Sequence, residues 1–498
     1  MNIEHESSAF PSRTYARVVL EPAYDQAKQV LLHPMLAVNK AHLIMLYEQN
    51  IIRESDALSI ASALRELDLD TLGSGDYNPQ YEDLFFEIEH KLGELAGEIA
   101  SNLHLARSRN DMGISLYRIV LRNKLLNVID SGVVLHRSMQ SFIGLHKDTI
   151  MIAHTHTQQA QPTTLAHYIS AVSDSLERDL LRFKRAFIGC NHSSLGAAAL
   201  TTSGFPVSRE RVAELLGFGG IIENAYDAVS GADYVGEAAA VTQLAAINLG
   251  RFVQDLLLWC TQEFGILQVA APYVQISSIM PQKRNPVSIE HARSLLSISK
   301  GNAETVLSII HNTPFGDIVD TEDDLQPYAW KSLDTLSSVY ELLAEVISTL
   351  KVNTELLKER AKKSFASVTE LADTLVRTEN LSFRKAHSIV SQIVTDLTTS
   401  GSGIEQISWT ALNDRMKEET GTELRLSPQQ LEQAIDPMHF VRVRQLTGGP
   451  NRDEVQRSLE GKSRRLTALN EWKEDTSRLI TSSFKNLDAI LSEWLIKA

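Results

Sequence analysis

Apolar residues recur at helical spacing through the middle of the chain and predict long helices. The proline-free segment from about Gly113 to Thr149 carries apolar or small residues at 4-3-4-3 steps, the spacing of a helix packed in a bundle. These positions are Leu121, Leu125, Val128, Gly132 and Leu135. Gly132 is the point at which the helix could be interrupted, because glycine costs about 1 kcal/mol in a helix interior.

Further helical segments follow the same rule. Pro162 is expected to open a helix with one apolar face, and another helix is expected from about Ser230 to Phe264. Two more runs are expected at about 287–311 and 327–350. No stretch shows the sustained apolar–polar alternation of a half-buried strand. The sequence therefore predicts an all-α fold.

Polar turns and shifts in composition divide the chain into three predicted domains. An N-terminal helical domain is expected over residues 1–111, a central domain of long helices over 112–360, and a C-terminal helical domain over 361–498. The last has shorter helical runs and more charged residues than the centre. Three domains agree with a length of 498 residues.

Charge and cysteine content argue against several classes of protein. The formal net charge is −14 and no dense basic cluster occurs, so neither nucleic acid nor an anionic membrane is expected as a partner. Cys190 and Cys260 lie in apolar helical stretches, which argues against a disulfide framework or a cysteine-based zinc site. No signal sequence or run of about twenty apolar residues is visible, so a cytoplasmic protein is expected.

One stretch, SSIMPQKRNP (277–286), gathers hydroxyls, a lysine and an asparagine around two prolines. Met280 and Asn285 each precede a proline and are pushed away from helical geometry, so an irregular loop is expected. Asn285 and Pro286 should then cap and open the next helix. Free backbone N–H groups at that helix start, next to Lys283, suit a carboxylate or a phosphate.

Two other polar blocks also stand before predicted long helices. They are RSRND (107–111) and HTHTQ (154–158). One such block alone is an ordinary helix cap, but three in one chain favour a site for a substrate with several negative charges. These two lie at opposite ends of a helix about 50 Å long, so different chains must supply them if both line one pocket. We therefore predict a homo-oligomer with shared active sites.

The three blocks resemble signature regions of the aspartase/fumarase superfamily, and most closely those of its argininosuccinate lyase branch. SSIMPQKRNP is similar to GSSxMPxKxNP, ARSRND (106–111) to GRSRND, and THTQQAQPT (155–163) to THxQxAQP. TELADTLVRTENLSFRKAH (369–387) is similar to the pattern DLAxYLVxKGxPFRxAH of that branch. The resemblance covers most of the chain from about residue 80 to 450.

This resemblance implies a homotetramer whose long central helices form a twenty-helix bundle, with each active site built from three chains. It implies a carbon–nitrogen lyase that eliminates fumarate from an N-substituted aspartate without a metal or an organic cofactor. The small-molecule substrate is then a dicarboxylate or a polycarboxylate.

The matching positions in the third block imply roles in proton abstraction. Ser277 matches the general base, which nearby donors and Lys283 must ionise because a free serine is a weak base. Lys283 and Asn285 match groups that stabilise the negatively charged intermediate. Ser278 is either a further substrate contact or a hydroxyl that supports the loop.

The first two blocks imply substrate contacts. In the first block, the residues that match the family's contacts to substrate carboxylates are Ser108, Arg109 and Asn110. Thr155 and His156 match groups linked to substrate binding and to protonation of the departing nitrogen, and Gln158 is a further contact. A structural hydrogen-bonding role is the alternative for His156.

Departures from the family pattern lie where the amine half of the substrate would bind. Phe85 stands where a histidine is usual, PFGDIVDTEDDLQP (314–327) replaces a YNKDLQED-like block, and Ile276 replaces a glycine. Argininosuccinate is therefore one candidate substrate, and an aminopolycarboxylate such as ethylenediamine-N,N'-disuccinate is another. An inactive crystallin-like homologue is a third alternative, although it predicts broken signature residues.

The chain lacks residues that two other enzyme classes require. A metal hydrolase is disfavoured because neither HExxH nor a cysteine cluster occurs. An ammonia-lyase with a self-formed electrophile needs an Ala-Ser-Gly triplet, which is absent from the sequence.

Overall fold

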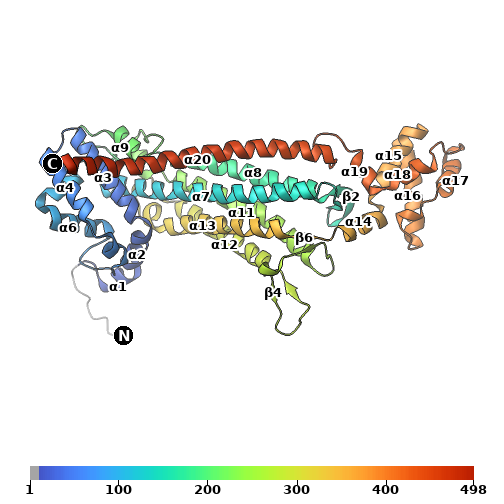
Figure 1. Cartoon of the computed structure of the whole chain (residues 1–498), viewed down its shortest axis with the longest axis horizontal. Helices are drawn as coiled ribbons and strands as arrows, with labels where there is room; N and C mark the ends of the chain where they lie inside the picture. The colour runs from blue at the N-terminus through green and yellow to red at the C-terminus, as the bar shows by residue number, and fades with distance from the viewer. Residues whose placement is uncertain (1–9, 498) are drawn as a thin grey trace.

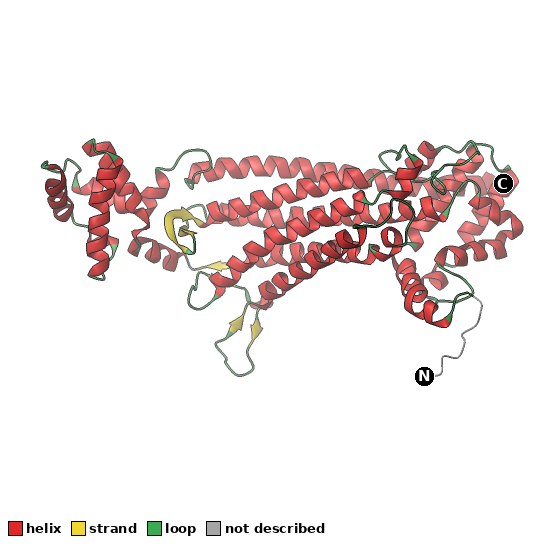
Figure 2. Cartoon of the chain, turned by 180° about the vertical axis from the view of Figure 1, so that it is seen from behind, coloured by secondary structure: helices red, strands yellow, loops and turns green. Residues whose placement is uncertain are grey.

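The computed structural model describes residues 10–497 and is built on a bundle of long helices (Figure 1). The bundle helices are α7 (Arg109–Leu145), α8 (Leu165–Cys190), α11 (Asp233–Cys260), α12 (Val287–Ile310) and α13 (Gln326–Thr349). Their buried faces share one apolar core. The all-α prediction is confirmed, and the view from behind shows only short strands among the helices (Figure 2).

Shorter helices surround the end of the bundle at which α7 begins. They are α1 (Arg13–Tyr15), α2 (Glu21–Val30), α3 (Leu32–Glu48), α4 (Glu54–Glu66), α5 (Leu69–Ser74), α6 (Leu84–Ala96), α9 (Arg209–Leu215) and α10 (Ala225–Ser230). Within residues 10–497 no single helix is both long and apolar enough to cross a membrane. The bent pair Arg13–Val30 and Leu32–Glu48 meets these criteria jointly, by length and composition alone.

A second group of short helices lies at the opposite end, and those between residues 368 and 435 share a separate apolar core. These helices are α14 (Thr354–Lys363), α15 (Val368–Glu379), α16 (Phe383–Thr399), α17 (Trp409–Thr420), α18 (Pro428–Ile435) and α19 (Pro437–Arg442). The last helix, α20 (Arg452–Lys497), leaves this group and runs back along the bundle to the N-terminal end (Figure 1).

Helix α7 is continuous through Gly132. A Cβ atom at Gly132 would lie 2.4 Å from Leu180 Cδ2 and 3.2 Å from Tyr340 Cε2, so a larger residue would separate α7 from α8 and α13. The glycine is present because three helices approach closely here, and the surrounding packing compensates for its low helix propensity. The interruption considered from the sequence does not occur.

Short antiparallel strand pairs flank two of the polar blocks. β1 (Ile150–Thr155) pairs antiparallel with β2 (Gln158–Thr164), and β4 (Gln275–Ile276) pairs with β5 (Arg284–Asn285). A third pair joins β3 (Leu267–Gln268) to β6 (Lys351–Val352). β3, β4, β5 and β6 have two residues each, and burial does not alternate along β1 or β2. None of these strands therefore gives the period-two pattern that predicts a strand from sequence.

Two predicted helix starts are wrong, by three residues at α8 and by one residue at α12. Pro162 does not open α8, because it pairs with Ile152 in the hairpin, and the Thr164 hydroxyl caps the helix by accepting from His167 N at 3.1 Å. Asn285 is not the cap of α12, because it pairs with Gln275 in the β4–β5 hairpin. Hairpin pairing overrides the local cap signal in both places.

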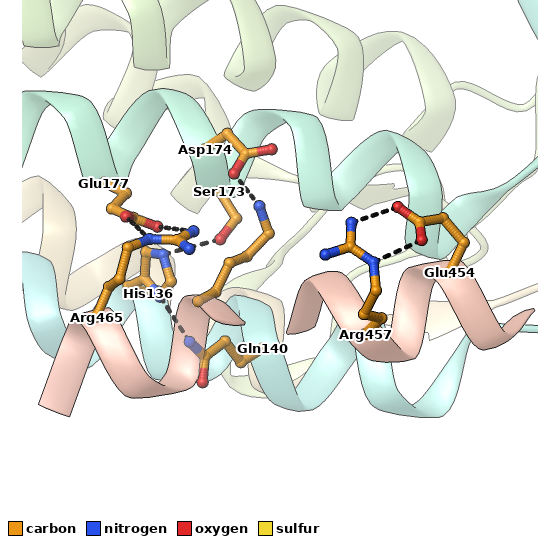
Figure 3. Close-up of polar contacts among 9 residues, drawn as sticks. His136, Gln140, Ser173, Asp174, Glu177, Glu454, Arg457 and Arg465 are labelled. Carbon is orange, nitrogen blue, oxygen red and sulfur yellow. Dashed lines mark hydrogen bonds and ion pairs between the residues drawn. The ribbon is translucent and has the colours of Figure 1, made fainter. Parts of the chain in front are cut away.

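Polar contacts join α20 to α8 beside a buried histidine of α7 (Figure 3). His136 lies between Gln140 and Ser173, and burial lowers its pKa to about 4, so the ring is neutral near pH 7. Beside it, Lys462 forms an ion pair with Asp174. The lysine side chain is 1% exposed and the aspartate side chain is 44% exposed, so the two partners differ greatly in their access to water.

This difference predicts unequal effects of removing each partner. Asp174→Ala leaves the Lys462 ammonium buried and unpaired, which should cost about 3 kcal/mol. Lys462→Met keeps the apolar stem and leaves a carboxylate that water can solvate, so the cost should stay within about 1 kcal/mol. Thermal unfolding at one protein concentration measures both variants, and equal losses would contradict the proposed asymmetry.

Candidate active site

The first polar block forms the N-terminus of α7. Ser108 is the N-cap residue, and its backbone N–H donates to Asp111 Oδ1 at 2.9 Å, which completes a capping box. The Ser108 hydroxyl also donates to the side-chain oxygen of Asn110. The cap therefore fixes the direction in which Arg109 and Asn110 leave the helix.

Arg109 is half-exposed and faces two carboxylates from the segment before α6. Its Nη1 atom lies 2.8 Å from Asp83 Oδ2 and 3.3 Å from Glu82 Oε1. The guanidinium also lies 4.7 Å from the centre of the Phe86 ring. A substrate carboxylate would have to share Arg109 with these two side chains or displace them.

Asn110 connects the cap to the segment that departs from the family pattern. Its side-chain amide donates to Asp317, which also contacts Glu322. Burial and this contact with Asp317 raise the pKa of Glu322 to about 9, so its carboxyl group is protonated at neutral pH. On the same segment, Asp323 accepts a hydrogen bond from the hydroxyl of Tyr117 on α7.

The second block lies at the exposed tip of the β1–β2 hairpin. His156 and Thr157 form the turn with φ values of 52° and 62°, and Thr155 pairs with Gln158 across it. Two positive φ values are typical of a type I′ turn, the turn that suits a two-residue hairpin. Thr155, His156 and Gln158 therefore point their side chains from one rigid tip at the surface.

The third block is the loop between β4 and β5, which projects from the side of the bundle in both views (Figures 1 and 2). The Ser277 hydroxyl accepts the backbone N–H groups of Met280 at 3.1 Å and Ile279 at 3.3 Å. Ser278 and Lys283 are exposed, and Asn285 is partly buried in β5. Ser278 and Lys283 are therefore accessible to solvent at the surface of the chain.

The structure does not bring the three blocks together within one chain. α7 contains 37 residues, so a straight helix of that length separates Arg109 from the β1–β2 hairpin by about 55 Å. The prediction that one long helix separates the first block from the second is confirmed. Each block instead stands at a separate place on the surface of the chain.

Several residues around the first block were missed by the sequence analysis as contributors to the site. The S-x-x-D spacing of Ser108 and Asp111 is a capping-box pattern and could have identified Asp111. The contact between Asn110 and Asp317 spans 207 residues and leaves no local signal. Among residues 10–497 no group of three or more His, Cys, Asp or Glu side chains is arranged to hold a metal ion.

Comparison with known proteins identifies the family. A profile described as lyase matches residues 28–298, and one described as argininosuccinate lyase C-terminal matches residues 365–442. The chain is 37% identical over 469 residues to argininosuccinate lyase 2 of Agrobacterium fabrum, a match that covers 94% of this chain and 93% of that protein. The chain belongs to the argininosuccinate lyase family.

Other relatives and solved structures agree. An argininosuccinate lyase of Methanococcus maripaludis is 36% identical over 448 residues, covering 90% of this chain and 92% of that protein. EDDS lyase in complex with formate has a TM-score of 0.86 at 27% identity, covering 95% of this chain and 94% of that one. Fumarate lyase from Mesorhizobium sp. BNC1 shares the fold, with a TM-score of 0.71 at 16% identity over 89% and 97% of the two chains.

Membership of this family defines the reaction class. The protein is a carbon–nitrogen lyase of the argininosuccinate lyase type that releases fumarate, and it belongs to the aspartase/fumarase superfamily. Family members act on small dicarboxylate substrates. The family resemblance and the enzyme class predicted from the sequence are therefore confirmed.

The protonated Glu322 predicts a specific dependence of stability on pH. Because its folded pKa is near 9 and its ordinary value is 4.5, the folded lyase loses stability as pH rises from about 4.5 to about 9. Glu322→Gln removes this loss, so the variant should become progressively more stable than wild type over that range. Thermal unfolding from pH 5 to pH 9 measures the difference.

Glu370→Gln is a control, because the pKa of Glu370 is shifted in the opposite direction to that of Glu322. Burial alone would raise the pKa of Glu370, but hydrogen bonds and charge from Arg444 and Arg377 lower it overall. Its contribution is therefore present above about pH 4.5 and is lost as pH falls. A Glu322→Gln difference that does not change between pH 5 and pH 9 would contradict the assignment.

Proposed function

We propose that this lyase eliminates fumarate from an N-substituted aspartate at sites to which the three blocks of different chains in a homotetramer contribute. The observation that carries the proposal is the uninterrupted helix α7, which holds the first two blocks about 55 Å apart within one chain. Catalysis by these blocks then requires neighbouring copies. The cytoplasm is the expected location.

Ser277 is the proposed general base. Its hydroxyl oxygen already accepts two backbone N–H groups, from Ile279 and Met280, and donors aimed at an oxygen favour its ionised form. The serine oxygen would take the proton from the carbon next to a substrate carboxylate. Lys283 and Asn285 would stabilise the extra negative charge on that carboxylate in the intermediate.

The first two blocks would hold the substrate and complete the elimination. Arg109, Ser108 and Asn110 would bind substrate carboxylates, with the guanidinium suited to a bidentate contact. As the carbon–nitrogen bond breaks, its electron pair goes to nitrogen, and His156 would supply the proton that the departing amine needs. Thr155, Gln158 and Ser278 are proposed as further substrate contacts.

Argininosuccinate is the first candidate substrate. Asp83, Glu82 and Asp317 surround Arg109 and Asn110 with negative charge, and such a surface suits a cationic guanidinium on the amine half. The sequence identity of 37% to an argininosuccinate lyase supports the same choice. An aminopolycarboxylate is the second candidate, supported by the TM-score of 0.86 to EDDS lyase.

Absorbance of released fumarate distinguishes the two substrates. Wild-type protein should release fumarate from argininosuccinate faster than from ethylenediamine-N,N'-disuccinate, and Ser277→Ala should lower kcat by about 10²- to 10⁴-fold. Ser482→Ala, which changes an exposed hydroxyl on α20, is the matched control. Preference for the aminopolycarboxylate would select the second candidate, and an active Ser277→Ala enzyme would exclude serine as the base.

Mixed tetramers test whether sites are shared. Arg109→Ala and Ser277→Ala should each be nearly inactive, but equal mixing should restore about a quarter of the sites, because some sites receive an intact copy of each block. Arg109→Ala mixed with Asn110→Ala should restore nothing, since every first block is then damaged. Absence of recovery in verified mixed oligomers of the first pair would contradict shared sites.

A further inference from the structure

The loop that follows α8 has an unusual backbone next to the first block. Every second residue from Gly196 to Thr202 has a positive φ: 82° at Gly196, 51° at Ala198, 78° at Leu200 and 64° at Thr202. Positive φ is uncommon for residues other than glycine and costs about 1–3 kcal/mol at each one. Such a conformation persists only if its surroundings hold it in place.

The carboxylate of Asp111 holds the first half of this loop. Its Oδ2 atom accepts the backbone N–H groups of Gly196 at 2.8 Å and Ala198 at 3.0 Å. Its Oδ1 atom accepts the N–H of Ser108 at 2.9 Å. Backbone N–H groups that converge where φ alternates in sign form a nest for an anion, and here the anion is a side chain that is 0% exposed.

Other contacts hold the same loop to α7 without using this carboxylate. The Ser194 hydroxyl donates to the backbone carbonyl of Asp111 at 2.7 Å, and Ser194 N donates to the Ser115 hydroxyl at 3.2 Å. On the other side, the Arg209 side chain donates to the carbonyls of Leu195, Ile222 and Glu223. Several independent contacts therefore hold the loop to its surroundings, and the Asp111 carboxylate connects the loop to the backbone of the cap residue Ser108.

We propose that Asp111 is a positioning residue for the substrate-carboxylate block, because its one carboxylate sets both the α7 cap at Ser108 and the register of the loop 196–202. The inference rests on the proposed function of Arg109 and Asn110. These two residues lie between Ser108 and Asp111, so a change in the cap redirects both. A substrate-carboxylate contact that is equally strong in the ground state and the transition state lowers KM without changing kcat, so its weakening should appear in KM.

Asp111→Asn tests the proposal, because it keeps the size of the side chain and replaces one acceptor oxygen by a donor that faces backbone N–H groups. We expect the KM for the substrate to rise at least tenfold while kcat changes less than threefold, since Ser277 and His156 are untouched. Ser194→Ala is the matched control: it removes a bond between loop and helix but leaves the cap intact. It should change KM less than threefold even where it lowers Tm.

Ala198→Gly provides a second test if Asp111→Asn fails to fold. Glycine relieves the strain of a positive φ and makes the nest more flexible while Asp111 remains. KM should rise about two- to fivefold without a fall in Tm, a combination that a purely stabilising role does not produce. Unchanged KM in a folded Asp111→Asn enzyme, or an equal KM increase in Ser194→Ala, would overturn the proposal.

These outcomes are separate from those that test the proposed reaction. If the wild-type protein releases no fumarate from any N-substituted aspartate, the proposed function fails first. If it releases fumarate and Asp111→Asn retains the wild-type KM, only the positioning role is lost.

Discussion

The length of α7 is the constraint on which the arrangement of this lyase depends. Its 37 residues form one rigid spacer because Gly132 allows α8 and α13 to pack directly against the helix. A bent or broken α7 would allow blocks of one chain to approach each other, but a packed straight helix does not. Under the proposed mechanism, catalysis therefore requires assembly, because each copy contributes residues to the active sites of its neighbours.

Electrostatics at the start of α7 shape how a substrate could bind. Arg109 already has two carboxylate partners, so a substrate carboxylate gains only the difference between its own contacts and those of Glu82 and Asp83. The protonated Glu322 limits the negative charge that gathers next to Asp317. Under the proposed mechanism, the N-terminus of α7 would bind one carboxylate at Arg109 and favour a cationic group nearby, and this preference would discriminate between amine halves.

The sequence predicted the long helices and the three blocks because their signals are local. The spacing from Leu121 to Leu135 was sufficient for α7, since one apolar stripe repeats over several turns. The β1–β2 hairpin was missed because His156 and Thr157 give no sign that they adopt positive φ. The partners of Arg109 and Asn110 come from distant segments, so no local pattern in the sequence indicates them.

The return of α20 has a consequence for the timing of synthesis. Lys40 donates to Asp488 at 2.5 Å, and the centre of the Tyr47 ring lies 4.7 Å from that of Trp494. One face of α3 is therefore covered by residues of α20, which are synthesised last. At about 5–20 residues per second, a ribosome needs roughly 20 to 90 seconds between these partners. During that interval α3 has an uncovered face, which makes the nascent chain a candidate client for chaperones.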